Sequence, residues 1–223
     1  MKTKTLAAGI LSAAVLATAT SATALDWQPK EAGTWMVRLR MIDMKPQESG
    51  DVLTQATSAD SGWDVKLTED FVPEIDLTYF FTDNFAVEVI AGTTKHKARV
   101  YNGTTMVDAG DVKLLPPVVT AQWHFNPKGK VSPYVGAGIN YTFFYDVNDG
   151  SLSNVSYEDG FGWALQAGVD VATTGPWFVN FDVKKVWLDT DLKADATGVG
   201  LVPVKSDVDI DPWVFGVGLG RKF

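Results

Sequence analysis

The feature that most constrains this chain is a two-residue alternation of apolar and polar side chains, repeated in eight separate segments. In residues 34–43, one face carries Val37 and Leu39 and is apolar. The opposite face carries Arg38 and Arg40. Seven segments keep this contrast between an apolar face and a polar or glycine-lined face, and the eighth is less regular. No segment has a sustained helical period, so the pattern predicts β-strands. The segments are residues 34–43, 73–81, 85–91, 115–125, 134–145, 162–171, 177–187 and 213–223.

The connections between these segments alternate in length. Long polar connections are expected at residues 46–70, 95–113, 146–159 and 189–207, and short ones at residues 82–84, 126–132 and 172–176. Long extracellular loops, short periplasmic turns and an even strand number are typical of an outer-membrane barrel. We therefore expect an all-β fold, an eight-stranded antiparallel transmembrane β-barrel with both termini in the periplasm.

A soluble eight-stranded barrel of the lipocalin type is the alternative, and its apolar face would point inward. The aromatic residues favour the membrane barrel, because they gather at both ends of the apolar face. Two such belts match the two interfaces of a bilayer. The belts consist of Trp35, Phe81, Phe85, Trp123, Phe125, Trp177 and Phe223 at the short-turn end, and Phe143, Tyr145, Trp163, Trp187 and Trp213 at the other.

Residues 1–24 are predicted to be a cleaved secretory signal. Lys2 and Lys4 form a charged start, a short Ala-rich apolar stretch follows, and Ala22-Thr23-Ala24 has the form of a cleavage site. The barrel would then occupy residues 25–223. The chain has no Cys, which excludes disulfides and Cys-ligated metals. Its 19 Lys and Arg against 27 Asp and Glu lack the basic footprint that nucleic-acid binding needs.

The polar faces of the strands are expected to line the barrel interior, which side chains just fill when there are eight strands. Opposite charges packed at this density satisfy one another, so we expect a paired polar plug. An ion-conducting pore is the alternative. The network is predicted to contain Arg38, Arg40, Glu74, Asp76, Glu88, Asp182, Lys184, Asp209 and Asp211.

Three carboxylates, Asp207, Asp209 and Asp211, fall on one face of a strand. We expect them to pair with Arg40 and Lys184 on the flanking strands. A divalent-cation site near the lipopolysaccharide surface is the alternative.

His96 and His124 are the two histidines of the chain, and neither has a nucleophile near it in the sequence. Their separation gives no support to a metal site. We therefore expect no enzyme activity, no metal and no cofactor.

Pro116 and Pro117 stand at the long-loop end of the fourth segment. Because proline cannot donate a ladder hydrogen bond, two in a row predict a gap in the wall beside the third segment. A simple strand start is the alternative. Apolar residues of the long connections are expected to form a mouth above the gap. They are Leu67, Phe71 and Leu114, with Leu53, Leu152 and Leu201 as further candidates.

Several blocks of the chain resemble the outer membrane protein W (OmpW) family. The resemblance implies an eight-stranded outer-membrane barrel with a role in passive uptake of small hydrophobic molecules. The chain departs from the family pattern in two places: Arg221 stands where an aromatic residue is usual, and Lys184-Lys185 stand where many members are aromatic or apolar. The matching blocks are residues 76–84 (DLTYFFTDN), 87–88 (VE), 115–117 (LPP), 120–123 (TAQW), 133–144 (PYVGAGINYTFF) and 211–215 (DPWVF).

We therefore predict a monomeric outer-membrane barrel of a Gram-negative bacterium. It would bind small hydrophobic molecules in an extracellular apolar pocket and pass them sideways into the bilayer. Its expected partners are outer-membrane lipid, lipopolysaccharide and the barrel insertion machinery, which would read Phe223 as a C-terminal signal. A receptor or structural barrel without transport is one alternative, and passage of small polar solutes such as amino acids through the lumen is another.

Overall fold

The computed structural model describes residues 27–47, 51–58, 60–68, 70–101, 105–195, 197 and 203–223. The predicted signal sequence and Leu201 lie outside these ranges. The described residues form one antiparallel sheet of 15 strands. Within them, no helix is long and apolar enough to cross a membrane.

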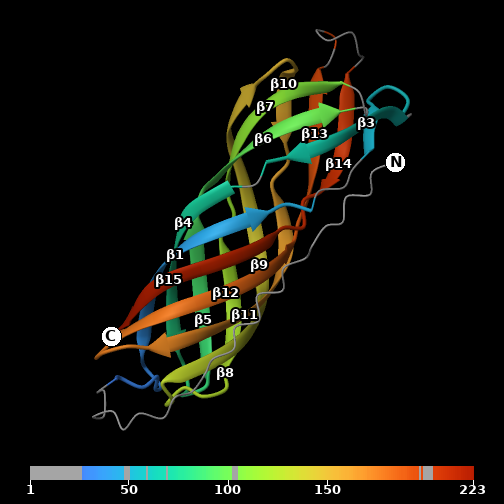
Figure 1. The fold of residues 1–223 in the computed structure, drawn as a ribbon. Coiled ribbons are helices and arrows are strands. Elements are labelled where there is room, and N and C mark those ends of the chain that lie inside the picture. Colours follow the sequence, from blue (N-terminus) through green and yellow to red (C-terminus); the bar gives the residue numbers. More distant parts are fainter. Residues whose placement is uncertain are drawn as a thin grey trace, which may run out of the picture.

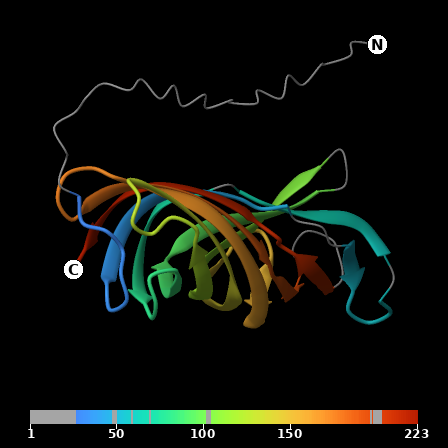
Figure 2. The same ribbon diagram turned by 90° about the horizontal axis from the view of Figure 1, so that it is seen from below.

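Eight strands close into a barrel, as the alternation predicts. Each pairs antiparallel with its neighbours, and the last pairs with the first. Figures 1 and 2 show these strands curving around a common interior. They are β1 (Trp35–Lys45), β4 (Asp70–Phe80), β5 (Phe85–Gly92), β8 (Val118–His124), β9 (Val131–Asp149), β11 (Gly160–Ala172), β12 (Trp177–Trp187) and β15 (Trp213–Lys222).

The outer surface of this barrel is apolar. Leu39 is 60% exposed and Trp163 70%, whereas Arg38 and Arg40 are fully buried inside. This polarity is the reverse of a soluble barrel and suits a wall that faces lipid. The soluble lipocalin-like alternative is therefore wrong.

The long connections are predicted from the sequence to be polar loops, but in the structure they also form strands. These pair into a sheet that continues beyond β1, β4 and β15 (Figure 1). The additional strands are β2 (Asp51–Thr54), β3 (Asp60–Leu67), β6 (Thr94–Tyr101), β7 (Met106–Leu115), β10 (Ser153–Tyr157), β13 (Asp189–Asp195) and β14 (Val204–Asp209).

In this extracellular sheet the polarity is inverted relative to the membrane barrel. On β6, His96, Ala98 and Val100 are buried, and Lys97 and Arg99 between them are exposed. The buried side chains include an apolar cluster with Val52, Leu152 and Leu192. The alternation is thus present in both parts, but apolar residues face lipid in the barrel and face the interior above it.

The segment before β1 closes the periplasmic end of the barrel. The Gln28 backbone N donates to Gly175 O at 2.9 Å, and Lys30 N donates to Pro127 O at 3.0 Å. Above this segment, Met36, Phe80 and Phe178 form a buried apolar cluster. The floor of the barrel is therefore sealed by backbone bonds and by packed side chains.

Glycines on the inner face of β15 leave room for large side chains from neighbouring strands. A Cβ atom added at Gly218 would lie 2.7 Å from Arg40 Cγ and would also collide with Leu39 O. At Gly216, the nearest atom to an added Cβ is 3.4 Å away. The fit between small and large inner residues is therefore much tighter at Gly218.

We predict that Gly218→Ala lowers the free energy of unfolding by about 1–3 kcal/mol, because the extra methyl forces strand β15 away from β1. Gly216→Ala serves as the matched control and should change it by less than about 1 kcal/mol. Urea unfolding in detergent micelles measures both. Equal losses in the two variants would contradict this account of the glycines.

Candidate functional site

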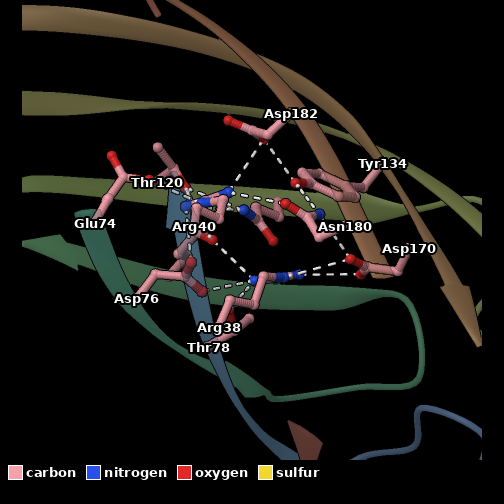
Figure 3. Close-up of polar contacts among 12 residues, drawn as sticks. Arg38, Arg40, Glu74, Asp76, Thr78, Thr120, Tyr134, Asp170, Asn180 and Asp182 are labelled. Carbon is pink, nitrogen blue, oxygen red and sulfur yellow. Dashed lines mark hydrogen bonds and ion pairs between the residues drawn. The ribbon is translucent and has the colours of Figure 1, made fainter. Parts of the chain in front are cut away.

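The lower half of the barrel interior holds a network of buried ion pairs, with Arg38 and Arg40 of β1 at its centre (Figure 3). Arg38 Nη1 lies 2.9 Å from Asp76 Oδ1 and 2.9 Å from Glu88 Oε1. Its Nη2 lies 3.0 Å from Asp170 Oδ2. Strands β4, β5 and β11 thus each supply a carboxylate to one guanidinium.

Arg40 sits one inward position further along β1 and meets a second set of carboxylates. Its Nη2 lies 2.9 Å from Asp76 Oδ2, and its Nη1 lies 3.4 Å from Asp182 Oδ2. Its Nε lies 2.8 Å from Glu74 Oε1, an ion pair whose geometry is too bent for a hydrogen bond. Asp76 therefore bridges the two arginines.

Lysines extend the network at both ends. Lys184 Nζ lies 3.0 Å from Glu74 and 3.0 Å from Asp182. Below Arg38, Lys30 Nζ lies 2.6 Å from Asp170 Oδ2 and 3.0 Å from His124 Nδ1. Because nearly every charge has a close opposite partner, the lumen is a packed polar plug at this level.

Of the residues predicted for the network, the structure brings together Arg38, Arg40, Glu74, Asp76, Glu88, Asp182 and Lys184. The predicted pairing of Arg40 with Asp209 or Asp211 is wrong. Asp209 is exposed and lies opposite Asp189 in the extracellular sheet. Asp211 has a left-handed backbone (φ 35°), and its Oδ1 accepts a hydrogen bond from Leu188 N at 3.0 Å. The chain turns between β14 and β15, which moves both carboxylates away from the lumen.

The divalent-cation alternative gains no support from the structure. Within the described ranges, no group of three or more His, Asp or Glu side chains could hold a metal ion. The side chain of Asp207 lies outside the described part.

Sequence reasoning missed Lys30, Asp170 and Tyr134 as members of the network. Asp170 lies on the same inward face of β11 as Gln166, so the two-residue alternation could have identified it. Tyr134 Oη donates to Asp182 at 2.6 Å and fills space left by Gly168. Lys30 precedes the first strand, so the alternation along the strands could not predict that its side chain enters the lumen.

An apolar cavity of about 50 Å³ lies directly above the plug. Glu74 and Lys184 line it where it meets the network. The rest of its lining is largely apolar and comes from both the barrel and the extracellular sheet. It includes Ile42, Leu67, Ile90, Leu114, Pro116 and Val186.

A second cavity of about 10 Å³ shares Leu67 and Leu114 with the first. Tyr157 of β10 lines it, and burial raises the pKa of the Tyr157 phenol, so this group stays neutral. His96 lines both cavities, and its ring nitrogens contact Thr68 O at 2.6 Å and Thr94 Oγ1 at 3.1 Å. The predicted mouth residue Phe71 is 64% exposed and does not line either cavity, because its side chain lies on the outward-facing side of β4.

Pro116 and Pro117 lie at a seam in the wall. Ile90 pairs with Val118 and Thr94 pairs with Leu114, but no described pair joins residues 91–93 to residues 115–117. On the other side, Pro117 O accepts hydrogen bonds from Tyr141 N at 3.2 Å and from the Asn140 side chain at 3.1 Å. The proline segment is therefore unpaired on the side of β5 and hydrogen-bonded on the side of β9.

A hydroxyl contact spans this seam on the outer surface. Thr93 Oγ1 lies 2.5 Å from Tyr145 Oη, and both side chains are exposed. Thr93 follows β5 and Tyr145 belongs to β9, so the contact reaches across the intervening strand. The seam is closed in this arrangement.

We predict that Arg40→Ala lowers the free energy of unfolding by roughly 3–5 kcal/mol, since the four buried carboxylates around it would then share only Arg38 and Lys184 as counter-charges. Lys193→Ala removes an exposed pair with Glu158 and should cost at most about 1 kcal/mol. Chemical unfolding in micelles tests both. A loss at Arg40 no larger than that at Lys193 would refute the role of the network.

Comparisons with known proteins agree with this architecture. The OmpW family profile matches residues 31–223. The outer-membrane protein y4mB of Sinorhizobium fredii, described as uncharacterized, is 37% identical over 97% of this chain and 90% of its own length. Outer membrane protein W of Salmonella typhi is 37% identical over 86% of this chain and 90% of its own length.

Two further similarities come from Pseudomonas aeruginosa. The crystal structure of its outer membrane protein OprG superposes with a TM-score of 0.82 at 28% identity and covers 89% of this chain and 99% of that chain. A protein named Dibenzothiophene metabolism operon protein PahQ is 28% identical over 86% of this chain and 90% of its own length. The lipid-facing apolar wall and these relatives assign the protein to the outer membrane of a Gram-negative bacterium. On the strength of the profile match, the sequence identity and the shared barrel, the chain belongs to the OmpW family.

Proposed function

We propose that this protein is a passive uptake channel for small hydrophobic molecules, which bind in the apolar cavity and leave sideways into the bilayer. The observation that carries the proposal is the position of the cavity. It lies on top of the closed ionic plug and beside the seam at Pro116. A solute in this cavity has the plug below it and a weakened wall next to it.

Passage straight through the lumen is disfavoured by the plug. A route between Arg38, Arg40 and their carboxylates would separate buried charges, each of which is costly to leave unpaired. Small polar solutes would face the same cost of charge separation on a route through the lumen. An apolar solute that left for water would also lose roughly 25 cal/mol per Å² of apolar area. Exit into hydrocarbon keeps that area dry.

The seam supports a lateral exit because proline has no N–H group. Opening the wall beside Pro116 and Pro117 frees fewer backbone donors than opening it elsewhere, and unsatisfied donors are what a bilayer tolerates least. Opening also requires the Thr93–Tyr145 contact to break. That contact is exposed, so water or lipid headgroups can replace it.

The small volume of the cavity supports a coupling between solute binding and opening of the seam. About 50 Å³ is smaller than the ~150 Å³ cavity that accommodates benzene in a protein core. A small aromatic or aliphatic solute must therefore push Leu67, Leu114 and Pro116 apart as it enters. The name of PahQ, which refers to dibenzothiophene metabolism, supports an apolar ring compound as a candidate solute.

We predict that replacing both Pro116 and Pro117 by Val slows uptake of an apolar probe into liposomes, because the added N–H groups let the two strands pair. Pro133→Val in β9, away from the seam, is the matched control and should transport like the parent. Folding is checked by heat-modifiable migration on gels. Uptake by the double variant at the parent rate would exclude a lateral route at this position and favour a receptor role.

We also propose that Phe223 ends a C-terminal signal for the barrel insertion machinery. Its ring is exposed, while its backbone N and O bond to Trp35 and help close the barrel. Phe223→Ala keeps those backbone bonds and removes only the ring.

We predict that Phe223→Ala reduces the folded form in outer membranes several-fold yet folds like the parent in detergent, where no machinery is present. Immunoblots of membranes and refolding yields in micelles measure the two. An equal defect in both would assign Phe223 to stability rather than recognition, and normal assembly in cells would remove the signal altogether.

A further inference from the structure

Strands β12 and β15 carry an outward-facing cation between aromatic rings at each rim of the barrel. At the extracellular rim, Lys185 Nζ lies 6.0 Å from the Trp187 ring centroid and 5.7 Å from that of Trp213. At the periplasmic rim, Arg221 Cζ lies 5.6 Å from the Trp177 centroid and 4.7 Å from that of Phe223. Both arrangements are within cation–π range.

The two cations differ in their polar partners. Lys185 Nζ donates to Asp211 O at 2.5 Å and to the Gln47 side chain at 3.2 Å. In the described part of the chain, no carboxylate lies within ion-pair distance of Arg221, and its guanidinium donates no hydrogen bond. Lys185 is therefore satisfied by the protein, whereas the five N–H donors of Arg221 have no acceptor among the described residues.

Two other cations at the periplasmic rim are engaged within the protein. Lys222 turns inward and donates to Gln28 O. Lys128 lies 2.8 Å from Asp83. Lys130, in the turn before β9, is exposed and makes no ion pair with a described residue, but no described aromatic ring flanks it. Arg221 is thus distinguished by its outward position between two aromatic rings.

Arg221 lies at the depth of lipid headgroups. The stretch of β15 from Trp213 to Arg221 runs about 26 Å along the strand, which is ~20 Å across the membrane at a tilt of about 40°. That distance is close to the ~25 Å height of the apolar band of such barrels. Since Trp213 lies in the extracellular belt, Arg221 reaches the opposite, periplasmic interface.

We propose that Arg221, held between Trp177 and Phe223, binds the phosphodiester of a glycerophospholipid in the periplasmic leaflet. A guanidinium presents two parallel N–H groups to two phosphate oxygens, and the flanking rings restrict its orientation. The rings also offer an apolar surface to the glycerol and the start of the acyl chains. Arg221 thereby acquires a role as a lipid anchor at the periplasmic rim.

A direct test uses protein with ¹⁵N-labelled arginine side chains in phospholipid bilayers and measures ³¹P dephasing of the guanidinium signals by solid-state NMR. One signal, absent from the spectrum of Arg221→Gln, should dephase. Arg38 and Arg40 are fully buried and serve as internal references that should not. No dephasing of any guanidinium signal in the parent would overturn the proposal, and this outcome can be read without the variant.

Native mass spectrometry with titrated phosphatidylglycerol and phosphatidylethanolamine gives the matched comparison. Arg221→Gln should weaken retention of both lipids about tenfold, because both share the phosphodiester. Lys185→Gln should bind like the parent, and a diacylglycerol lipid with a sugar headgroup should not be retained. Equal loss in the two variants, or equal retention of the sugar lipid, would show nonspecific adsorption instead.

Discussion

The rest of this structure depends on the buried pairing of Arg38 and Arg40 with carboxylates from other strands. Inside a barrel of eight strands there is no room for bulk water, so each inward charge must find a partner on another strand. Asp76 and Glu88 reach both guanidiniums, which couples β1 to β4 and β5 at one register. A slip of one residue would turn these charges toward lipid.

Above this network, the inward-facing residues of several strands change from charged to apolar. On β1, Arg38 and Arg40 are followed by Ile42. On β5 Glu88 is followed by Ile90, and on β12 Lys184 is followed by Val186. The apolar cavity forms where these changes meet, because side chains of the barrel and of the extracellular sheet both turn inward there. The break at Pro116 lies at the same level. Cavity and seam are therefore two consequences of one transition, from a wall that faces lipid to a sheet that faces water.

The outer surface of the barrel has distinct features at the two membrane interfaces. Aromatic residues mark both interfaces, and on β12 and β15 they flank a cation at each rim. The protein satisfies Lys185 itself, whereas Arg221 is the cation that we propose binds a lipid. On the lateral route that we propose, the barrel must hold its depth in the bilayer so that the seam opens into hydrocarbon. An anchor at the opposite rim is compatible with that requirement.

The sequence by itself determined the eight membrane strands, the lipid-facing side of each, both aromatic belts and most of the buried charges. These follow from a period of two residues, which is a local property of the chain. Only the tertiary structure decided that Arg40 meets Glu74 and Asp182 rather than Asp209, that Lys30 enters the lumen, and that the long connections form a second sheet. The two-residue alternation predicts which way a side chain points. The partner of that side chain depends on how neighbouring strands are staggered. That stagger is set by closure of the whole barrel and by breaks such as the turn at Asp211, where residues far apart in sequence meet.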